Sequence, residues 1–126
     1  MKAWIGAVAL VGVLGSGGVN ATDGNMLLEY CQLTVRAIDS EPVPQNSRTN
    51  ISIGQCFGMV ESARTTVMIY EGEIPKKGRA CFPDGVTTNS QLARIVSKYL
   101  HDNPAKLNED ATVLIQLAYR DAYPCK

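Results

Sequence analysis

The sequence has little of what catalysis requires. It contains one histidine, His101, among 126 residues, and no glycine-rich phosphate loop outside its first 21 residues. Its carboxylates are scattered, with no paired spacing. An active site needs a convergent acid, base or nucleophile, and His101 lies where a helix is expected to end, which favours a solvated residue that complements the helix dipole. The sequence therefore predicts a protein that is not an enzyme, without a cofactor or a metal.

The sequence also lacks an excess of charge of either sign. Twelve lysines and arginines balance twelve aspartates and glutamates. A broadly basic surface of the kind that binds nucleic acid is therefore excluded. Lys76, Lys77 and Arg79 form the one local basic cluster, and we interpret it as part of a solvated loop.

No apolar run is long enough to cross a membrane. The longest, residues 3–14, falls short of the roughly 20 apolar residues that a spanning helix needs. It follows Lys2 and precedes glycines and Val19-Asn20-Ala21, a pattern typical of a secretory signal peptide. We expect residues 1–21 to be removed, which leaves a single domain over residues 22–126 with no stable membrane anchor.

Cysteines are few, but their arrangement is informative. The four of them, Cys31, Cys56, Cys81 and Cys125, all follow the expected cleavage point, and none forms a Cys-x-x-Cys pair. With no histidine at metal-ligand spacing, zinc is a poor interpretation and two disulfides are favoured. Four cysteines allow three pairings. We favour Cys56–Cys81 with Cys31–Cys125, each contributing about 3–5 kcal/mol by loop entropy.

Hydrophobic periodicity predicts four amphipathic helices and hence a small all-α bundle. Asp23 or Asn25 can cap the first helix, and Asn108 can cap the last. Polar loops are expected over residues 39–50 and 71–80. The apolar positions expected to face the core are Leu27, Cys31, Val35 and Ile38 in the first helix, Ile53, Cys56, Phe57, Val60, Ala63, Val67 and Met68 in the second, and Ala111, Leu114, Ile115, Ala118 and Ala122 in the fourth.

The third helix has the clearest boundaries. Thr88 can cap it, with Gln91 completing a capping box, and Pro104 ends it because the residue before a proline avoids the α conformation. Its apolar face comprises Leu92, Ile95, Val96, Tyr99 and Leu100.

The second helix, expected over residues 51–70, carries Gly54 and Gly58 in its interior. A glycine inside a helix costs about 1 kcal/mol relative to alanine, so we expect both to allow a close approach of another helix. The β-prone residues 65–70 could instead form a strand, but no partner strand is evident, and we assign them to the helix end.

The contexts of the four cysteines carry a family resemblance. Asp23-Gly24-Asn25 precedes the first cysteine, the second lies in Gly54-Gln55-Cys56-Phe57-Gly58, the third opens Cys81-Phe82-Pro83-Asp84-Gly85, and the fourth ends Ala122-Tyr123-Pro124-Cys125. Over residues 23–125 this order resembles the Rap/Tai family of periplasmic immunity proteins against amidase toxins delivered by type VI secretion. The resemblance implies an all-α, disulfide-bonded protein, often a homodimer, that binds a peptidoglycan amidase effector and occludes its catalytic cleft.

The motifs that match are structural and do not identify the contact residues. We expect these in exposed polar segments, first Glu71, Glu73, Lys76, Lys77 and Arg79, and second Asp39 and Glu41. The segment before the third cysteine is shorter than expected for this family, which limits how far it could protrude. The alternative function is a periplasmic stress chaperone or envelope accessory protein with no toxin partner.

Overall fold

The computed structural model describes residues 21–85 and 87–126, and the predicted signal peptide falls almost entirely outside this part of the chain. The all-α prediction is confirmed. Within the described residues, four α-helices and two short 3₁₀ helices follow one another: α1 (Gly24–Ile38), α2 (Ser47–Tyr70), η1 (Lys76–Gly78), α3 (Asn89–Asp102), η2 (Pro104–Lys106) and α4 (Ala111–Ala122). Residues 65–70 belong to α2, as expected.

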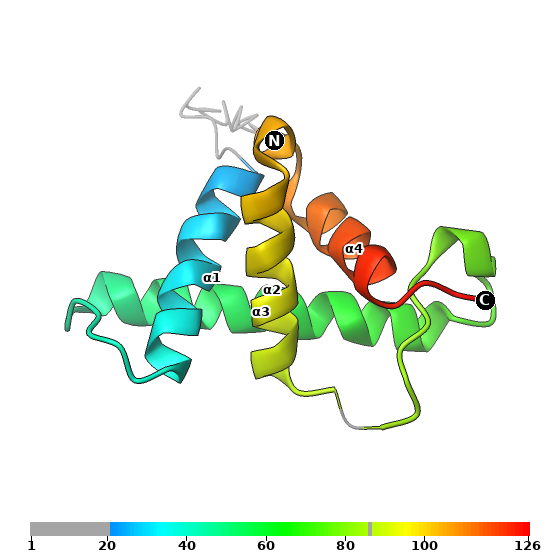
Figure 1. The fold of residues 1–126 in the computed structure, drawn as a ribbon, viewed down its shortest axis with the longest axis horizontal. Helices are drawn as coiled ribbons and strands as arrows, with labels where there is room; N and C mark the ends of the chain where they lie inside the picture. Colours follow the sequence, from blue (N-terminus) through cyan, green and yellow to red (C-terminus); the bar gives the residue numbers. More distant parts are fainter. Residues whose placement is uncertain (1–20, 86) are drawn as a thin grey trace, which may run out of the picture.

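The longest helix, α2, forms the base on which the others pack. Figure 1 shows α1 and α3 side by side, crossing α2, with α4 leaning over the other half of its length. The core lies where these helices meet. It is built from aliphatic residues of all four helices, both cysteines of the α1–α2 pair, and Tyr119; its largest members are Tyr119, Leu27, Leu92, Leu100, Leu114 and Ile115.

Two helix starts agree with the sequence. Asp23 caps α1 by accepting a hydrogen bond from the Met26 amide. Thr88 caps α3, and Gln91 closes the capping box by accepting from the Thr88 amide. Each motif acts within one turn, so the sequence alone contains all the contacts that it needs.

Two other helix starts differ from the prediction. Helix α2 begins at Ser47, not near residue 51, because the Asn46 side chain accepts from the Thr49 amide and so extends the helix into a polar stretch. Helix α4 is capped by Asp110 and not by Asn108. The Asp110 carboxylate accepts from the amides of Thr112 and Val113.

The starts of α1 and α4 are joined to each other. Asp23 and Asp110 form an isolated antiparallel bridge, in which the Gly24 amide donates to the Glu109 carbonyl and the Ala111 amide donates to the Thr22 carbonyl. This bridge selects Asp110 as the cap, since it fixes where the backbone turns into α4.

The core prediction for α2 was too broad. Cys56, Val60, Ala63 and Val67 are buried, whereas Ile53 and Phe57 are half-buried and Met68 is exposed. Ala122, expected on the inner face of α4, is also exposed, and Tyr119 is buried one turn earlier. Helix α4 therefore leaves the core at its last turn, which frees the C-terminus to reach Cys81.

The two predicted disulfides are present, but the favoured pairing was wrong. Cys31 bonds Cys56, with their Cα atoms 5.1 Å apart, and Cys81 bonds Cys125, with their Cα atoms 5.0 Å apart. The crossing of α1 over α2 brings the first pair together. The second pair meets because the Cys81 amide donates to the Tyr123 carbonyl, which lays the C-terminal segment beside residue 81.

Candidate functional site

The segment predicted to contact a partner follows directly on the last turn of α2. Met68, Ile69 and Tyr70 are 53%, 67% and 47% exposed in that turn. Successive helical residues are about 100° apart around the axis, so exposure of three in a row means that the end of α2 stands clear of the bundle. Beyond it, Glu71, Glu73, Lys76 and Lys77 are all exposed. We call these seven residues the end surface.

The loop that carries the end surface is tied to the body of the protein at several points. The amides of Glu73 and Ile74 donate to the Tyr70 carbonyl, and η1 closes through the bond from the Gly78 amide to the Pro75 carbonyl. Arg120 of α4 donates to the Lys77 carbonyl at 2.7 Å. The Cys81–Cys125 disulfide fixes the chain just beyond the loop.

Arg79 lies apart from the other four predicted contact residues. It is half-buried, and its guanidinium turns back to donate to the carbonyls of Ile74 at 3.1 Å and Ala80 at 3.3 Å. The structure thus brings Glu71, Glu73, Lys76 and Lys77 onto one exposed loop, whereas Arg79 supports that loop from inside.

The second-choice residues lie elsewhere, in the connection between α1 and α2. Asp39 accepts two hydrogen bonds from Arg94 of α3, at 2.5 and 3.2 Å, and Glu41 lies 3.7 Å from the Arg36 guanidinium. The hydrogen bond from Arg94 lowers the pKa of Asp39. Both carboxylates therefore tie the connection to neighbouring helices.

Chemically reactive groups do not converge in the described part of the chain. His101 is exposed, 3.5 Å from the Asp102 carboxylate. All four cysteines are in disulfides. Among residues 21–85 and 87–126, no three histidine, cysteine, aspartate or glutamate side chains gather into a metal-binding cluster, and no helix is long and apolar enough to cross a membrane.

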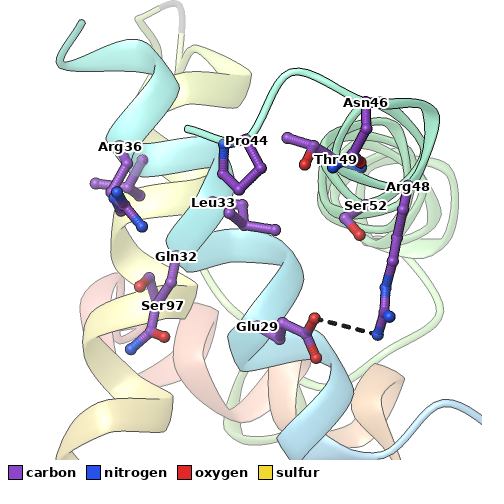
Figure 2. A pocket seen from close by; sticks show the side chains of 11 residues that line it. Glu29, Gln32, Leu33, Arg36, Pro44, Asn46, Arg48, Thr49, Ser52 and Ser97 are labelled. Carbon is purple, nitrogen blue, oxygen red and sulfur yellow. Dashed lines mark hydrogen bonds and ion pairs between the residues drawn. The ribbon is translucent and has the colours of Figure 1, made fainter. Parts of the chain in front are cut away.

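A concave site lies between α1, the connection to α2 and the first turns of α2, and sequence reasoning missed it. We call it the α1–α2 groove (Figure 2). Its volume is about 610 Å³, within the range typical of small-molecule sites. Its lining residues are Glu29, Gln32, Leu33, Val35, Arg36, Pro44, Asn46, Arg48, Thr49, Ser52 and Ser97.

The buried residues of α2 contain a pattern from which the groove could have been predicted. The stripe runs through Thr49, Ser52, Cys56, Val60, Ala63 and Val67 at intervals of three or four residues. Its first two members carry hydroxyls where the later ones are apolar or a cysteine. Hydroxyl residues thus replace apolar residues on this face at the amino end of α2, where the helix lines the groove instead of the core.

Comparison with protein families gives one finding. Residues 23–125 match the model of the family described as Rap1a immunity proteins, which covers nearly all of the described chain. No curated protein matches the chain.

Proposed function

Because the chain belongs to the family of Rap1a immunity proteins, we propose that it acts in the periplasm and protects the cell from a peptidoglycan amidase delivered by type VI secretion. In this proposal it binds the toxin and covers its catalytic cleft. It performs no chemistry of its own. The family match over residues 23–125 is the observation that carries the proposal.

Export is part of this proposal. Lys2, the apolar run over residues 3–14 and the small residues before residue 22 would direct the chain out of the cytoplasm and be removed as a signal peptide. The mature domain would then be residues 22–126. The two disulfides support this assignment, since structural disulfides persist in oxidising compartments such as the periplasm.

We assign toxin binding to the end surface. Its composition resembles that of protein interfaces, in which aromatic residues and methionine are enriched and a polar rim surrounds an apolar centre. Met68, Ile69 and Tyr70 would form the centre. Glu71, Glu73, Lys76 and Lys77 would form the rim.

Rigidity supports this assignment. A loop that is already ordered loses less conformational entropy when it docks, so more of the contact energy appears as affinity. The bond from Arg120 to the Lys77 carbonyl, the internal contacts of Arg79 and the Cys81–Cys125 disulfide all order the loop before a partner arrives.

The first test uses oxidised mature protein as bait in a lysate of the native organism. We expect one stoichiometric partner that hydrolyses peptidoglycan and whose activity falls as bait is added. Recovery of no defined partner would contradict the proposal. A spread of unrelated periplasmic proteins, bound more at acidic pH, would favour the chaperone or accessory function instead.

The second test asks whether the end surface makes the contact. Tyr70→Ala should weaken toxin binding by about tenfold or more, because truncation of a central aromatic residue is among the costliest interface changes. Val113→Ala is the matched control, since Val113 is similarly exposed on α4. Equal affinities of the two variants, measured by calorimetry, would place the interface elsewhere.

A further inference from the structure

A concavity adjoins the end surface, and Arg64 of α2 lines it. The concavity lies between the last turns of α2 and residues 79–85, which pass each other in Figure 1, and its volume is about 450 Å³. Met68 and Glu71, two residues of the end surface, line it as well. A protein that docks on the end surface would therefore cover this concavity, which we call the Arg64 pocket.

The guanidinium of Arg64 lacks an acceptor in the described part of the chain. Its Nε is buried, and among residues 21–85 and 87–126 it has no hydrogen-bond partner. The ion pairs of the same residues do not include Arg64. A buried donor without a partner costs free energy, and the cost is larger for a charged group. Because arginine nitrogens only donate hydrogen bonds, the missing partner is an acceptor.

The cations of the Arg64 pocket lie deeper than its acids. Arg64 and Arg79 are half-buried, and Arg79 bonds backbone carbonyls, which carry no charge to neutralise its own. Glu71 and Asp84 also line the pocket, but both are exposed. Since solvent and salt screen exposed charges more than half-buried ones, the interior of the pocket favours an anion.

The walls of the Arg64 pocket are apolar. They include Val67, Phe82 and Pro83, and the ring of Phe82 packs edge-on against Tyr119 of the core. Apolar walls strengthen the attraction between a cation and an anion, because the local dielectric constant is low. They also favour a carboxylate on a side chain over a hydrated free ion, since the methylene groups of the side chain can pack against them.

Docking of a partner on the end surface would exclude water from the Arg64 pocket. Arg64 would then be charged, buried and unpaired, which is strongly unfavourable. A partner that binds there must therefore bring an anionic acceptor.

We propose that the Arg64 pocket receives the carboxylate of an aspartate or glutamate side chain of the protein that docks on the end surface. Water does not reach Nε in the free protein, so the guanidinium turns toward the carboxylate, and Nε and one Nη donate to its two oxygens. Such paired bonds are the strong form of this contact. The inference rests on the proposed function, since the partner is the toxin assigned to the end surface.

The direct test adds a blocked aspartate, N-acetylaspartate N-methylamide, to the mature, oxidised protein and follows the Nε–Hε resonances of its arginines by NMR. Arg64→Met identifies the resonance of Arg64 by its loss. We expect this resonance to shift, with Kd in the millimolar range, and that of exposed Arg48 to shift much less. N-acetylasparagine N-methylamide, at the same ionic strength, should bind about tenfold more weakly because it carries no charge.

The second test uses the toxin that the bait recovers. Arg64→Met should lower the affinity for it about tenfold or more, measured by calorimetry. Arg48→Met is the matched control, because Arg48 is an 86% exposed arginine of the same helix, and it should bind as the unmodified protein does. Asp84→Asn should bind at least as tightly, since it removes a like charge from the rim of the pocket.

Thermal unfolding separates binding from folding. Arg64→Met should melt at the same temperature as the unmodified protein or higher, because an apolar side chain of similar length replaces a buried donor without a partner. A loss of toxin affinity in this variant is then a loss of the contact.

The inference would be overturned by an unmoved Arg64 resonance, by equal binding of the two blocked amino acids, or by equal toxin affinity of Arg64→Met and the unmodified protein. The last result would leave the proposed function in place, because the unmodified protein would still bind and inhibit the toxin. Failure of the proposed function gives a different result: no toxin binds the unmodified protein, and the inference fails with it.

Discussion

At the scale of single residues, Tyr119 contacts core residues that lie far from it in the sequence. Its hydroxyl donates to the Val60 carbonyl at 2.6 Å, which joins α4 to α2. Its ring packs edge-on against Phe82, with ring centroids 5.3 Å apart. Burial, chiefly, raises the pKa of Tyr119 well above its usual range; nearby Tyr123 adds to the increase and Arg64 opposes it.

This pKa shift predicts a loss of stability at alkaline pH. The unfolded tyrosine ionises near pH 10, whereas the folded one resists ionisation. The contribution of Tyr119 to the free energy of unfolding is therefore fully present below about pH 10. It decreases as the pH rises beyond that value. Tyr119→Phe should reduce stability by about 1–2 kcal/mol at neutral pH and flatten this alkaline decline.

Urea unfolding at about pH 8 and about pH 11 tests the prediction, since these values lie on either side of the unfolded pKa. Tyr70→Phe is the control, because Tyr70 is exposed on the end surface. An alkaline decline of the same size in Tyr119→Phe and the unmodified protein would show that Tyr119 does not cause it.

At the scale of elements, the glycines of the helices have opposite roles. Gly54 and Gly58 of α2 are exposed, and a Cβ added at either would meet no atom within 4 Å. The expectation that they allow a close helix approach was wrong. Gly24, at the start of α1, is the glycine that does so: a Cβ there would lie 2.5 Å from Leu114 Cδ1 and 2.8 Å from Leu107 Cα.

Alanine at these positions should therefore change stability in opposite directions. Gly54→Ala and Gly58→Ala should each raise the free energy of unfolding by about 0.4–1 kcal/mol, because alanine restricts the unfolded chain and adds no clash. Gly24→Ala should lower it by about 1–3 kcal/mol, since the backbone of Leu107 must move. Chemical denaturation of the three variants measures both effects, and a stabilised Gly24→Ala would contradict the packing described for α1.

At the scale of the whole molecule, each disulfide joins a different pair of segments. One links α1 to α2, and the other links the C-terminal segment to the chain that follows the loop of the end surface. Cys31–Cys56 spans 25 residues inside the core, where both cysteines are fully buried. Cys81–Cys125 spans 44 residues, and both of its cysteines are half-buried. Loop-entropy estimates assign them about 3.5 and about 4 kcal/mol.

Because thiol–disulfide exchange needs access to sulfur, mild reductant should open Cys81–Cys125 first and leave Cys31–Cys56 intact. The melting temperature should then fall by about 15 °C or more, and toxin binding should weaken as the loop of the end surface loses its tie. Alkylation of the new thiols followed by peptide mass spectrometry identifies the opened bond. Simultaneous opening of both disulfides would contradict the difference in burial.

The sequence predicted those features whose contacts lie within a turn or two of the chain. The capping box of Thr88 and Gln91, the Asp23 cap and the all-α class are of this kind, since helical periodicity and capping involve residues three or four apart. The order of the cysteine contexts was also enough to indicate the family that the match over residues 23–125 supports.

Features that depend on distant residues came only from the tertiary structure. The pairing of Cys31 with Cys56 depends on where α1 crosses α2, and the Asp110 cap depends on the bridge to Asp23. The α1–α2 groove is lined by residues of α1, α2 and α3 that are far apart in the sequence, although the hydroxyls in the stripe of α2 were visible beforehand. The sequence by itself determined the four helices, the Asp23 and Thr88 caps and the number of disulfides, because these rest on local bonding and composition. The pairing, the groove and the exposed end of α2 were decided by packing, which sets the distances between residues far apart in the chain.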